Sequence, residues 1–163
     1  MNKFIHLKGI LEEDFVNYKK PSMFLITSEC DWKCCTENDI PIKSCQNNSL
    51  INQPTIAYSI DTIINHYMNN DITEAIVFGG LEPFLQPFEV VDFIELFREK
   101  SNDDIVIYTG FYKKEISCLI NELKRYKNII VKFGRYVPNQ ELHYDEVLGI
   151  NLVSGNQYAE KIS

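Results

Sequence analysis

The alternation of short apolar runs with amphipathic helical periods is the feature that most limits how this chain can fold. Short apolar runs bounded by glycine or polar residues indicate buried strands, whereas apolar residues three and four positions apart indicate helices. Strands that alternate with helices pair in parallel through right-handed crossovers, so the sequence predicts an α/β fold. Strands are predicted at residues 22–29, 74–80, 104–110, 128–134 and 146–152, and helices at residues 59–69, 87–100 and around 116–123.

The ends of the predicted strands carry the unusual residues of the chain. In parallel sheets and barrels, ligands collect at the carboxyl ends of the strands. A cysteine-rich loop follows the first predicted strand, and Gly79-Gly80, Thr109-Gly110 and Gly134-Arg135 end or follow the next three. We therefore expect one site, on the C-terminal rim of the strands.

Length and charge limit the class of protein further. A chain of 163 residues with 45% hydrophobic residues can form one domain with a real core. We expect residues 22–163 to form this domain and residues 1–21 to be an N-terminal extension. The 16 basic and 23 acidic residues give a net charge of −7 without a basic stripe, so no nucleic-acid partner is expected. No long apolar segment or signal sequence is found, so we expect a cytoplasmic protein with no membrane partner.

Cysteines are strongly clustered in this sequence. Cys30, Cys34, Cys35 and Cys45 lie in one loop, and Cys118 stands alone. In a reducing compartment, clustered thiols indicate metal or redox chemistry rather than disulfides.

Three kinds of cysteine site compete for this loop. A structural zinc site usually takes two C-x-x-C pairs, and a thioredoxin-like site takes one that opens a helix; neither pattern occurs. Three thiolates on one loop suit a cubane iron–sulfur cluster with one iron left open. Some of these cysteines could instead be small buried thiols, but the polar neighbours Asp31, Lys33 and Glu37 argue against burial.

Short motifs occur in a fixed order between residues 22 and 157. They are Cys30-Asp31-Trp32-Lys33-Cys34, Cys45-Gln46-Asn47, Gly79-Gly80-Leu81-Glu82-Pro83, Tyr108-Thr109-Gly110-Phe111, Phe133-Gly134-Arg135-Tyr136 and Ser154-Gly155-Asn156-Gln157. Together they resemble the radical S-adenosylmethionine proteins and, within that superfamily, the small activases of anaerobic ribonucleotide reductase. The resemblance implies an incomplete (β/α) barrel with parallel strands.

The cysteine loop departs from the pattern of that family. Ten residues separate Cys34 from Cys45 where the family has two, and Cys35 is additional. Leu81 interrupts the usual glycine-glycine-glutamate turn, and Phe133 replaces an aspartate. The resemblance implies cluster ligation by Cys30, Cys34 and Cys45, with Cys35 as the alternative to Cys34.

The resemblance also implies two cofactors, a [4Fe–4S] cluster and S-adenosylmethionine. Gly79 and Gly80 would allow close approach of the backbone, and Glu82 would accept a hydrogen bond from the methionyl ammonium group. A tight turn between strand and helix is the alternative explanation of this segment. Thr109 and Gly110 could lie near the ribose or adenine, although an ordinary turn between strand and helix explains them equally well. Arg135 could pair with a carboxylate of the ligand or with a partner, or it could be a solvated residue after a strand. No side chain is assigned a catalytic role, because the cofactors carry the reaction.

The implied function is the generation of a 5′-deoxyadenosyl radical. The radical would activate a large glycyl radical enzyme such as anaerobic ribonucleoside-triphosphate reductase, with electrons from a donor such as flavodoxin or ferredoxin. The alternatives are a radical S-adenosylmethionine enzyme that acts on another substrate, and a non-catalytic protein that binds an iron–sulfur cluster or another metal.

Overall fold

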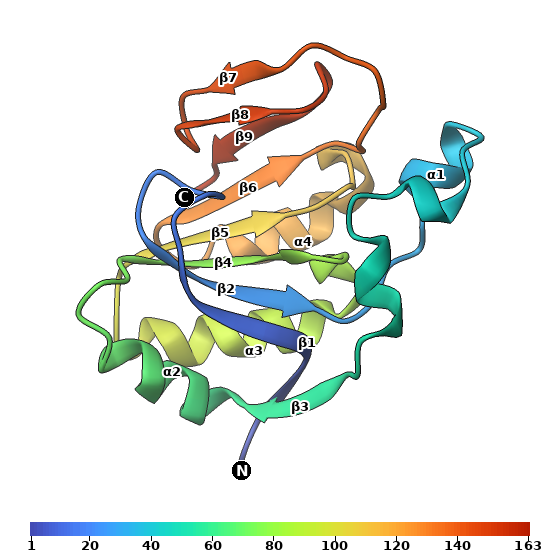
Figure 1. Cartoon of the computed structure of the whole chain (residues 1–163). Helices are drawn as coiled ribbons and strands as arrows, with labels where there is room; N and C mark the ends of the chain where they lie inside the picture. Colours follow the sequence, from blue (N-terminus) through green and yellow to red (C-terminus); the bar gives the residue numbers. More distant parts are fainter.

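Four apolar strands lie side by side in parallel at the centre of the fold. The computed structural model describes residues 1–163. The central strands are β2 (Ser22–Thr27), β4 (Ala75–Gly80), β5 (Asp104–Tyr108) and β6 (Ile129–Phe133), paired in that order. All four point toward the side of the molecule on which the cysteine-rich loop lies (Figure 1). The parallel arrangement predicted from the sequence is therefore confirmed.

Antiparallel strands extend this sheet at both sides. The seven strands have the order β3-β1-β2-β4-β5-β6-β9, so β3 and β9 are its edges and the sheet is open. The added strands are β1 (Phe4–Asp14), β3 (Ile56–Ser59) and β9 (Tyr158–Lys161). The protein is thus an α/β protein with a largely parallel central sheet.

The N-terminal segment contributes more to the sheet than the sequence suggested. Residues 1–21 were expected to form an extension before the first strand. Instead, β1 pairs along its length with β2 and β3. Ile5 and Leu7 are fully buried, because alternate side chains of this strand face the core.

The C-terminal segment also differs from the prediction. Only Ile150–Leu152 of the strand predicted at residues 146–152 is a strand, β8, and it pairs with β7 (His143–Asp145) in a separate hairpin. The preceding residues form the turn of this hairpin, where Gly149 has a φ of +72°. The exposed polar residues Glu146 and Asn151 fit a hairpin with one face in solvent better than a central strand buried on both faces.

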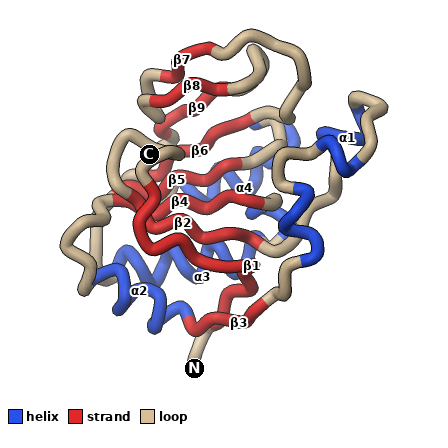
Figure 2. Tube along the Cα trace, viewed as in Figure 1, coloured by secondary structure: helices blue, strands red, loops and turns tan.

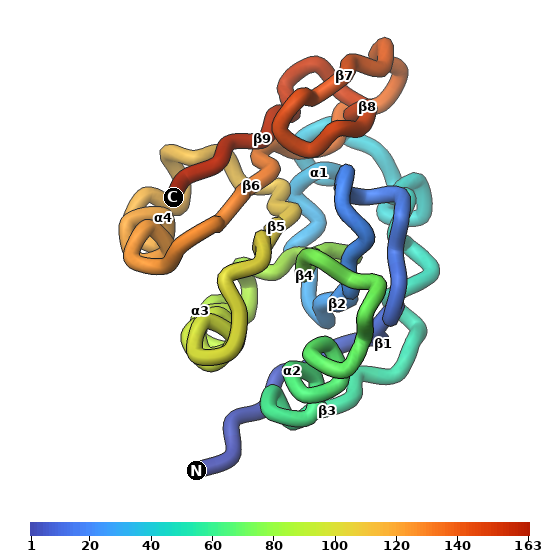
Figure 3. The backbone as a smooth tube through the Cα atoms, turned by 90° about the vertical axis from the view of Figure 1, so that its left-hand side faces the viewer, coloured from blue at the N-terminus to red at the C-terminus, as the bar shows by residue number.

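Three helices cover one face of the sheet. They are α2 (Ile60–Met68), α3 (Pro87–Arg98) and α4 (Ser117–Leu123), and Figures 2 and 3 show them on the same side of the strands. All three were predicted from the spacing of their apolar residues. None of the helices has the length and apolar character needed to cross a membrane.

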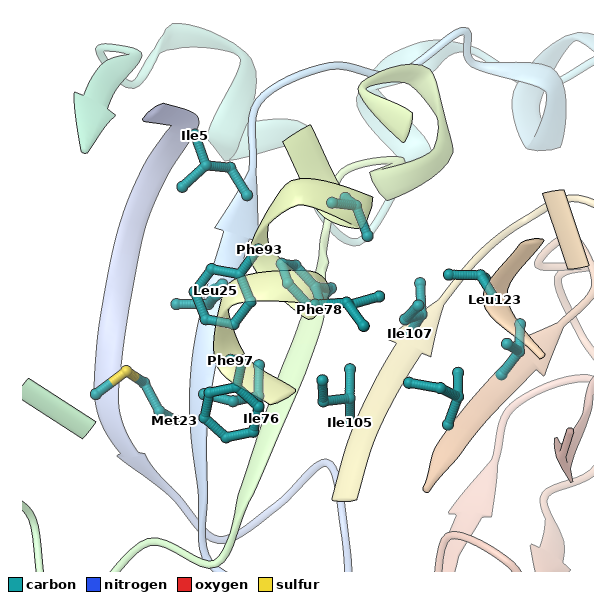
Figure 4. Close-up of a cluster of buried hydrophobic side chains, with 14 of the residues drawn as sticks. Ile5, Met23, Leu25, Ile76, Phe78, Phe93, Phe97, Ile105, Ile107 and Leu123 are labelled. Atoms are coloured by element: carbon teal, nitrogen blue, oxygen red, sulfur yellow. The ribbon is translucent and has the colours of Figure 1, made fainter. Parts of the chain in front are cut away.

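The larger core lies between these helices and the sheet. Phe78 of β4 packs edge-on against Phe93 of α3, with ring centroids 5.3 Å apart, and Phe97 stacks on Phe93 (Figure 4). Alternate residues of β4 and its neighbours face this core, so the remaining ones face the other side of the sheet.

The opposite face of the sheet is covered by the segment between β1 and β2 and by the β7–β8 hairpin. Tyr18 packs there with Leu148 and Leu152, and its hydroxyl donates to Asp104 at 2.9 Å. Lys20 forms an ion pair with the same carboxylate at 2.6 Å. This second cluster closes the side of the sheet toward which Lys132 of β6 is directed.

Candidate functional site

The carboxyl ends of the four parallel strands surround one cavity of about 280 Å³. Eight of the nine predicted site residues line it, and Gly79 lies in β4 next to the lining residue Gly80. The cysteine-rich loop, the turns after β4 and β5, the end of β6 and the β7–β8 hairpin all contribute to its wall. The lining site residues are Cys30, Cys34, Cys45, Gly80, Glu82, Thr109, Gly110 and Arg135.

The cysteine-rich loop has its own local structure. Helix α1 (Lys33–Glu37) begins after Trp32, whose φ is +60°, and two short 3₁₀ turns follow, Ile42–Ser44 and Asn48–Asn52. The base of the loop is joined to the turn after β4, because the Glu82 backbone N–H donates to the Glu29 carbonyl at 2.6 Å. Cys30 therefore starts its loop next to Glu82.

Backbone N–H groups approach three of the four loop sulfurs. The Trp32 N–H donates to Cys30 Sγ and the Asn47 N–H donates to Cys45 Sγ, both at 3.4 Å. The backbone N–H of Tyr136 lowers the pKa of Cys34. Such N–H···S bonds stabilise thiolates and tune iron–sulfur clusters.

Cys35 differs from these three cysteines. Its side chain is buried, with 2% exposure, and no backbone N–H donates to its sulfur. The arrangement of donors therefore favours Cys30, Cys34 and Cys45 as ligands over a set that contains Cys35.

Burial keeps the thiols of Cys30, Cys34 and Cys35 protonated in the metal-free protein. It raises the pKa of Cys30 to about 12 and also raises the pKa values of Cys34 and Cys35. The positive charge of Lys132 partly opposes this effect at Cys34. Because a thiolate is the metal ligand, metal binding here must release protons.

The cysteine sulfurs fit a cluster better than a single ion. No group of three or more histidine, cysteine, aspartate or glutamate side chains is arranged to share one ion. Four sulfurs around one zinc lie only about 3.8 Å apart, given Zn–S bonds of about 2.3 Å. In a cubane each thiolate binds a different iron, so a cluster site needs several thiols in the wall of one cavity, and Cys30, Cys34 and Cys45 line the same one.

Glu82 is a buried carboxylate with three donors. Its Oε1 accepts from the Phe84 N–H at 3.0 Å and from the Thr109 hydroxyl at 2.8 Å, and its Oε2 accepts from the Gly110 N–H at 2.8 Å. Burial raises the pKa of Glu82, while these donors act in the opposite direction. A carboxylate has about four acceptor positions, so one remains on Oε2.

Gly110 leaves open the space between Glu82 and the cysteine loop. A Cβ added at Gly110 would lie 3.5 Å from Cys34 Sγ and 3.6 Å from Glu82 Oε2. One side-chain methyl there would thus contact both groups, so the free acceptor position of Glu82 and the Cys34 sulfur border the same space.

The double glycine at the end of β4 is required by close packing. A Cβ on Gly79 would lie 2.8 Å from the Phe24 ring, and one on Gly80, whose φ is +85°, would lie 2.6 Å from Ile26. The Thr27 hydroxyl donates to the Gly79 carbonyl at 2.9 Å, which joins the ends of β2 and β4.

Arg135 is already engaged by the protein. Its guanidinium donates to Glu115 at 2.8 Å and forms an ion pair with Glu37 at 2.8 Å, and it lies over the Tyr112 ring. Arg135 lowers the pKa of Glu115 to about 2. It was predicted to contact a ligand or a partner; in the structure it joins the end of β6 to the cysteine-bearing helix α1.

Lys132 and Asn17 are two of the cavity-wall residues that the sequence analysis did not single out. Lys132 is 8% exposed, and Asn17 approaches from the segment between β1 and β2. The sequence held a signal for Lys132, because it is the one charged residue in the apolar run IIVKF. Asn17 gave no comparable signal.

Fold and site together define an α/β domain with three cysteine sulfurs and a buried carboxylate around one cavity at the ends of its parallel strands. The family model described as 4Fe-4S single cluster domain matches residues 21–152, and the chain belongs to this family. An iron–sulfur-cluster-binding domain is therefore indicated. The comparisons with curated proteins and with solved structures found no match.

Proposed function

We propose that this domain binds a [4Fe–4S] cluster and S-adenosylmethionine in the same cavity and generates a 5′-deoxyadenosyl radical. The observation that carries the proposal is the free acceptor position on the buried Glu82 carboxylate, which borders the same space beside Gly110 as the Cys34 sulfur. A ligand with an ammonium group can bind there while it also reaches an iron held by the cysteines.

The chain's contribution to the cluster site is a set of three oriented thiols. Cys30, Cys34 and Cys45 would hold the cluster, and the N–H groups of Trp32, Tyr136 and Asn47 would stabilise the bound thiolates. A reduced cluster of this type, when bound, supplies the electron that cleaves the sulfonium–C5′ bond of S-adenosylmethionine.

Glu82 would select the ammonium group of the ligand. Its three protein donors fix the orientation of the carboxylate before the ligand arrives, and burial strengthens a charge-assisted hydrogen bond to the remaining acceptor position. Thr109 acts on Glu82 rather than directly on the ligand, because its hydroxyl is donated to Oε1.

The fold is compatible with this assignment. We infer that the open sheet corresponds to an incomplete (β/α) barrel, with the site on the C-terminal rim of the parallel strands. The order of the sequence motifs further supports a glycyl radical enzyme, such as anaerobic ribonucleotide reductase, as the target of the radical, and a flavodoxin or ferredoxin as the electron donor.

The test is anaerobic reconstitution with iron and sulfide. Electron paramagnetic resonance of the reduced protein should give a [4Fe–4S]⁺ signal that changes when S-adenosylmethionine is added, and incubation with a reductant should yield 5′-deoxyadenosine. Adjacent cysteines provide a matched pair: Cys34→Ser should lose the cluster, and Cys35→Ser should retain it. Cys118→Ser controls for an exposed cysteine outside the site.

Two outcomes would contradict the proposal. A cluster whose signal is indifferent to S-adenosylmethionine would instead identify an electron carrier or a structural cluster. Retention of the cluster in Cys34→Ser together with its loss in Cys35→Ser would show that the ligand set is wrong.

A further inference from the structure

Lys132 is a buried cation directed into the candidate cluster cavity. Its neighbours Val131 and Phe133 face the helix-covered core, so the alternation along β6 turns Lys132 toward the opposite side of the sheet. There it lines the cavity together with Cys34 and Glu82. Only 8% of the residue is exposed.

The ammonium group of Lys132 lacks a close counter-charge within the protein. Its hydrogen bond goes to the Gly134 carbonyl at 3.2 Å, and the Tyr108 ring centroid lies 5.8 Å away. No carboxylate lies within ion-pair distance of Lys132 Nζ, whereas Arg135 is paired with Glu115 and Glu37. The second lysine of the cavity wall, Lys33, is partly exposed and lies 3.7 Å from Asp31.

An unpaired buried charge destabilises a folded protein, so its presence calls for an anion that the cavity receives. Glu82 is the carboxylate that acts electrostatically on Lys132, but the hydrogen bonds of its oxygens come from Phe84, Thr109 and Gly110 rather than from Lys132. The remaining source of negative charge in this cavity is the iron–sulfur cluster that the cysteines would hold. Cys34 and Lys132 line the same cavity and interact electrostatically.

We propose that Lys132 is the counter-charge of the iron–sulfur cluster and raises its reduction potential. The inference rests on the cluster-binding part of the proposed function and not on S-adenosylmethionine cleavage. A cluster with thiolate ligands is anionic, and one-electron reduction by an external donor adds a further negative charge. A fixed cation in a cavity of low dielectric stabilises the reduced form more than the oxidised one, and Lys132 keeps its proton throughout. Lys132 thus acts on the cluster through its charge and is not a catalytic residue.

The test is a redox titration of the reconstituted proteins at pH 7, with dithionite as reductant and the cluster signal as readout. Lys132→Met and Lys132→Gln remove the charge, and Lys132→Arg retains it. Lys33→Met removes a charge from the same cavity wall at a site where solvent screens it. We expect a more negative midpoint potential in the Met and Gln variants, a potential close to wild type in the Arg variant, and a smaller shift in Lys33→Met.

The inference would be overturned if the midpoint potential of wild type equalled that of a folded neutral variant, Lys132→Met or Lys132→Gln. A shift of the same size in Lys33→Met would also overturn it, because the effect would then come from net charge alone. A wild-type cluster that ignores S-adenosylmethionine would contradict the proposed radical chemistry while leaving the expected role of Lys132 unchanged. A wild-type protein that binds no cluster would overturn both.

Discussion

Removing the buried charge of Lys132 should stabilise the metal-free protein. Burial lowers the pKa of Lys132 from 10.5 to about 8. A pKa difference of one corresponds to about 1.4 kcal/mol, so the charged form is disfavoured in the folded state by about 3 kcal/mol. Lys132→Met, which keeps a long unbranched side chain without the charge, should therefore raise the free energy of unfolding at pH 7 by an amount of this order.

The pH dependence of this effect has a definite sign. The folded-state pKa lies below the unfolded one, so between pH 8 and 10.5 the unfolded chain binds more protons than the folded chain. The penalty is complete below pH 8 and disappears as the pH rises toward 10.5. The stability difference between Lys132→Met and wild type should thus be largest at pH 7 and shrink above pH 8.

Urea unfolding of the reduced, iron-free proteins at several pH values measures this difference. Titrations of the tyrosines and of cysteines other than Cys34, which interacts with Lys132, are common to both proteins and largely cancel in the comparison. Lys127→Met, at an exposed lysine, should change stability little at any pH. A Met variant that is less stable than wild type at pH 7, or a difference that stays constant up to pH 10.5, would refute the reasoning.

Three further predictions concern the frame of the site. Gly80→Ala should reduce the free energy of unfolding by at least about 1 kcal/mol in urea titrations, because Gly80 has a φ of +85° and a Cβ would lie 2.6 Å from Ile26. An unchanged free energy of unfolding would contradict the close packing at this position. Gly110→Ala should fold and hold the cluster, since its Cβ meets Cys34 at an ordinary contact distance of 3.5 Å, but should weaken S-adenosylmethionine binding roughly tenfold in calorimetry. Unchanged affinity would place the ligand elsewhere. Arg135→Lys should lower the free energy of unfolding by roughly 2 kcal/mol, because the paired contacts to Glu115 are lost. It should also speed the loss of the cluster to a chelator. Equal rates of cluster loss in the variant and in wild type would exclude a role of Arg135 in holding α1.

The central strands and their helices could be predicted because their sequence patterns are strong. Strands buried on both faces read as continuous apolar runs, and the helices repeat apolar residues at helical spacing. β1 was missed because only part of it alternates: Ile5 and Leu7 are buried, but the following residues through Glu13 are partly or fully exposed. Its place in the sheet follows from tertiary pairing with β2 and β3, which no local pattern encodes.

The location of the site was predictable for a topological reason, whereas the roles of some residues were not. Parallel strands bring their carboxyl ends to one edge whatever lies between them, so the gathering of Cys30, Glu82 and Gly110 follows from the strand assignment. The role of Arg135 depends on Glu37 and Glu115, which are distant in sequence and belong to different elements. Sequence spacing carries no information about such partners.

The lengthened cysteine loop illustrates how an unusual spacing can preserve a site. Increasing the separation of Cys34 and Cys45 from two residues to ten adds only about 1.4 kcal/mol of loop-closure entropy. Local turns oppose this cost: the Ile40 N–H donates to the Cys35 carbonyl at 3.0 Å, and the Cys45 N–H donates to the Ile42 carbonyl at 2.9 Å. After the loop, Lys8 of β1 donates to the Gln53 carbonyl at 2.7 Å and so anchors its far end to the sheet. The extra residues therefore return Cys45 to the cavity wall instead of displacing it, and the departure from the usual spacing is compatible with a cluster site.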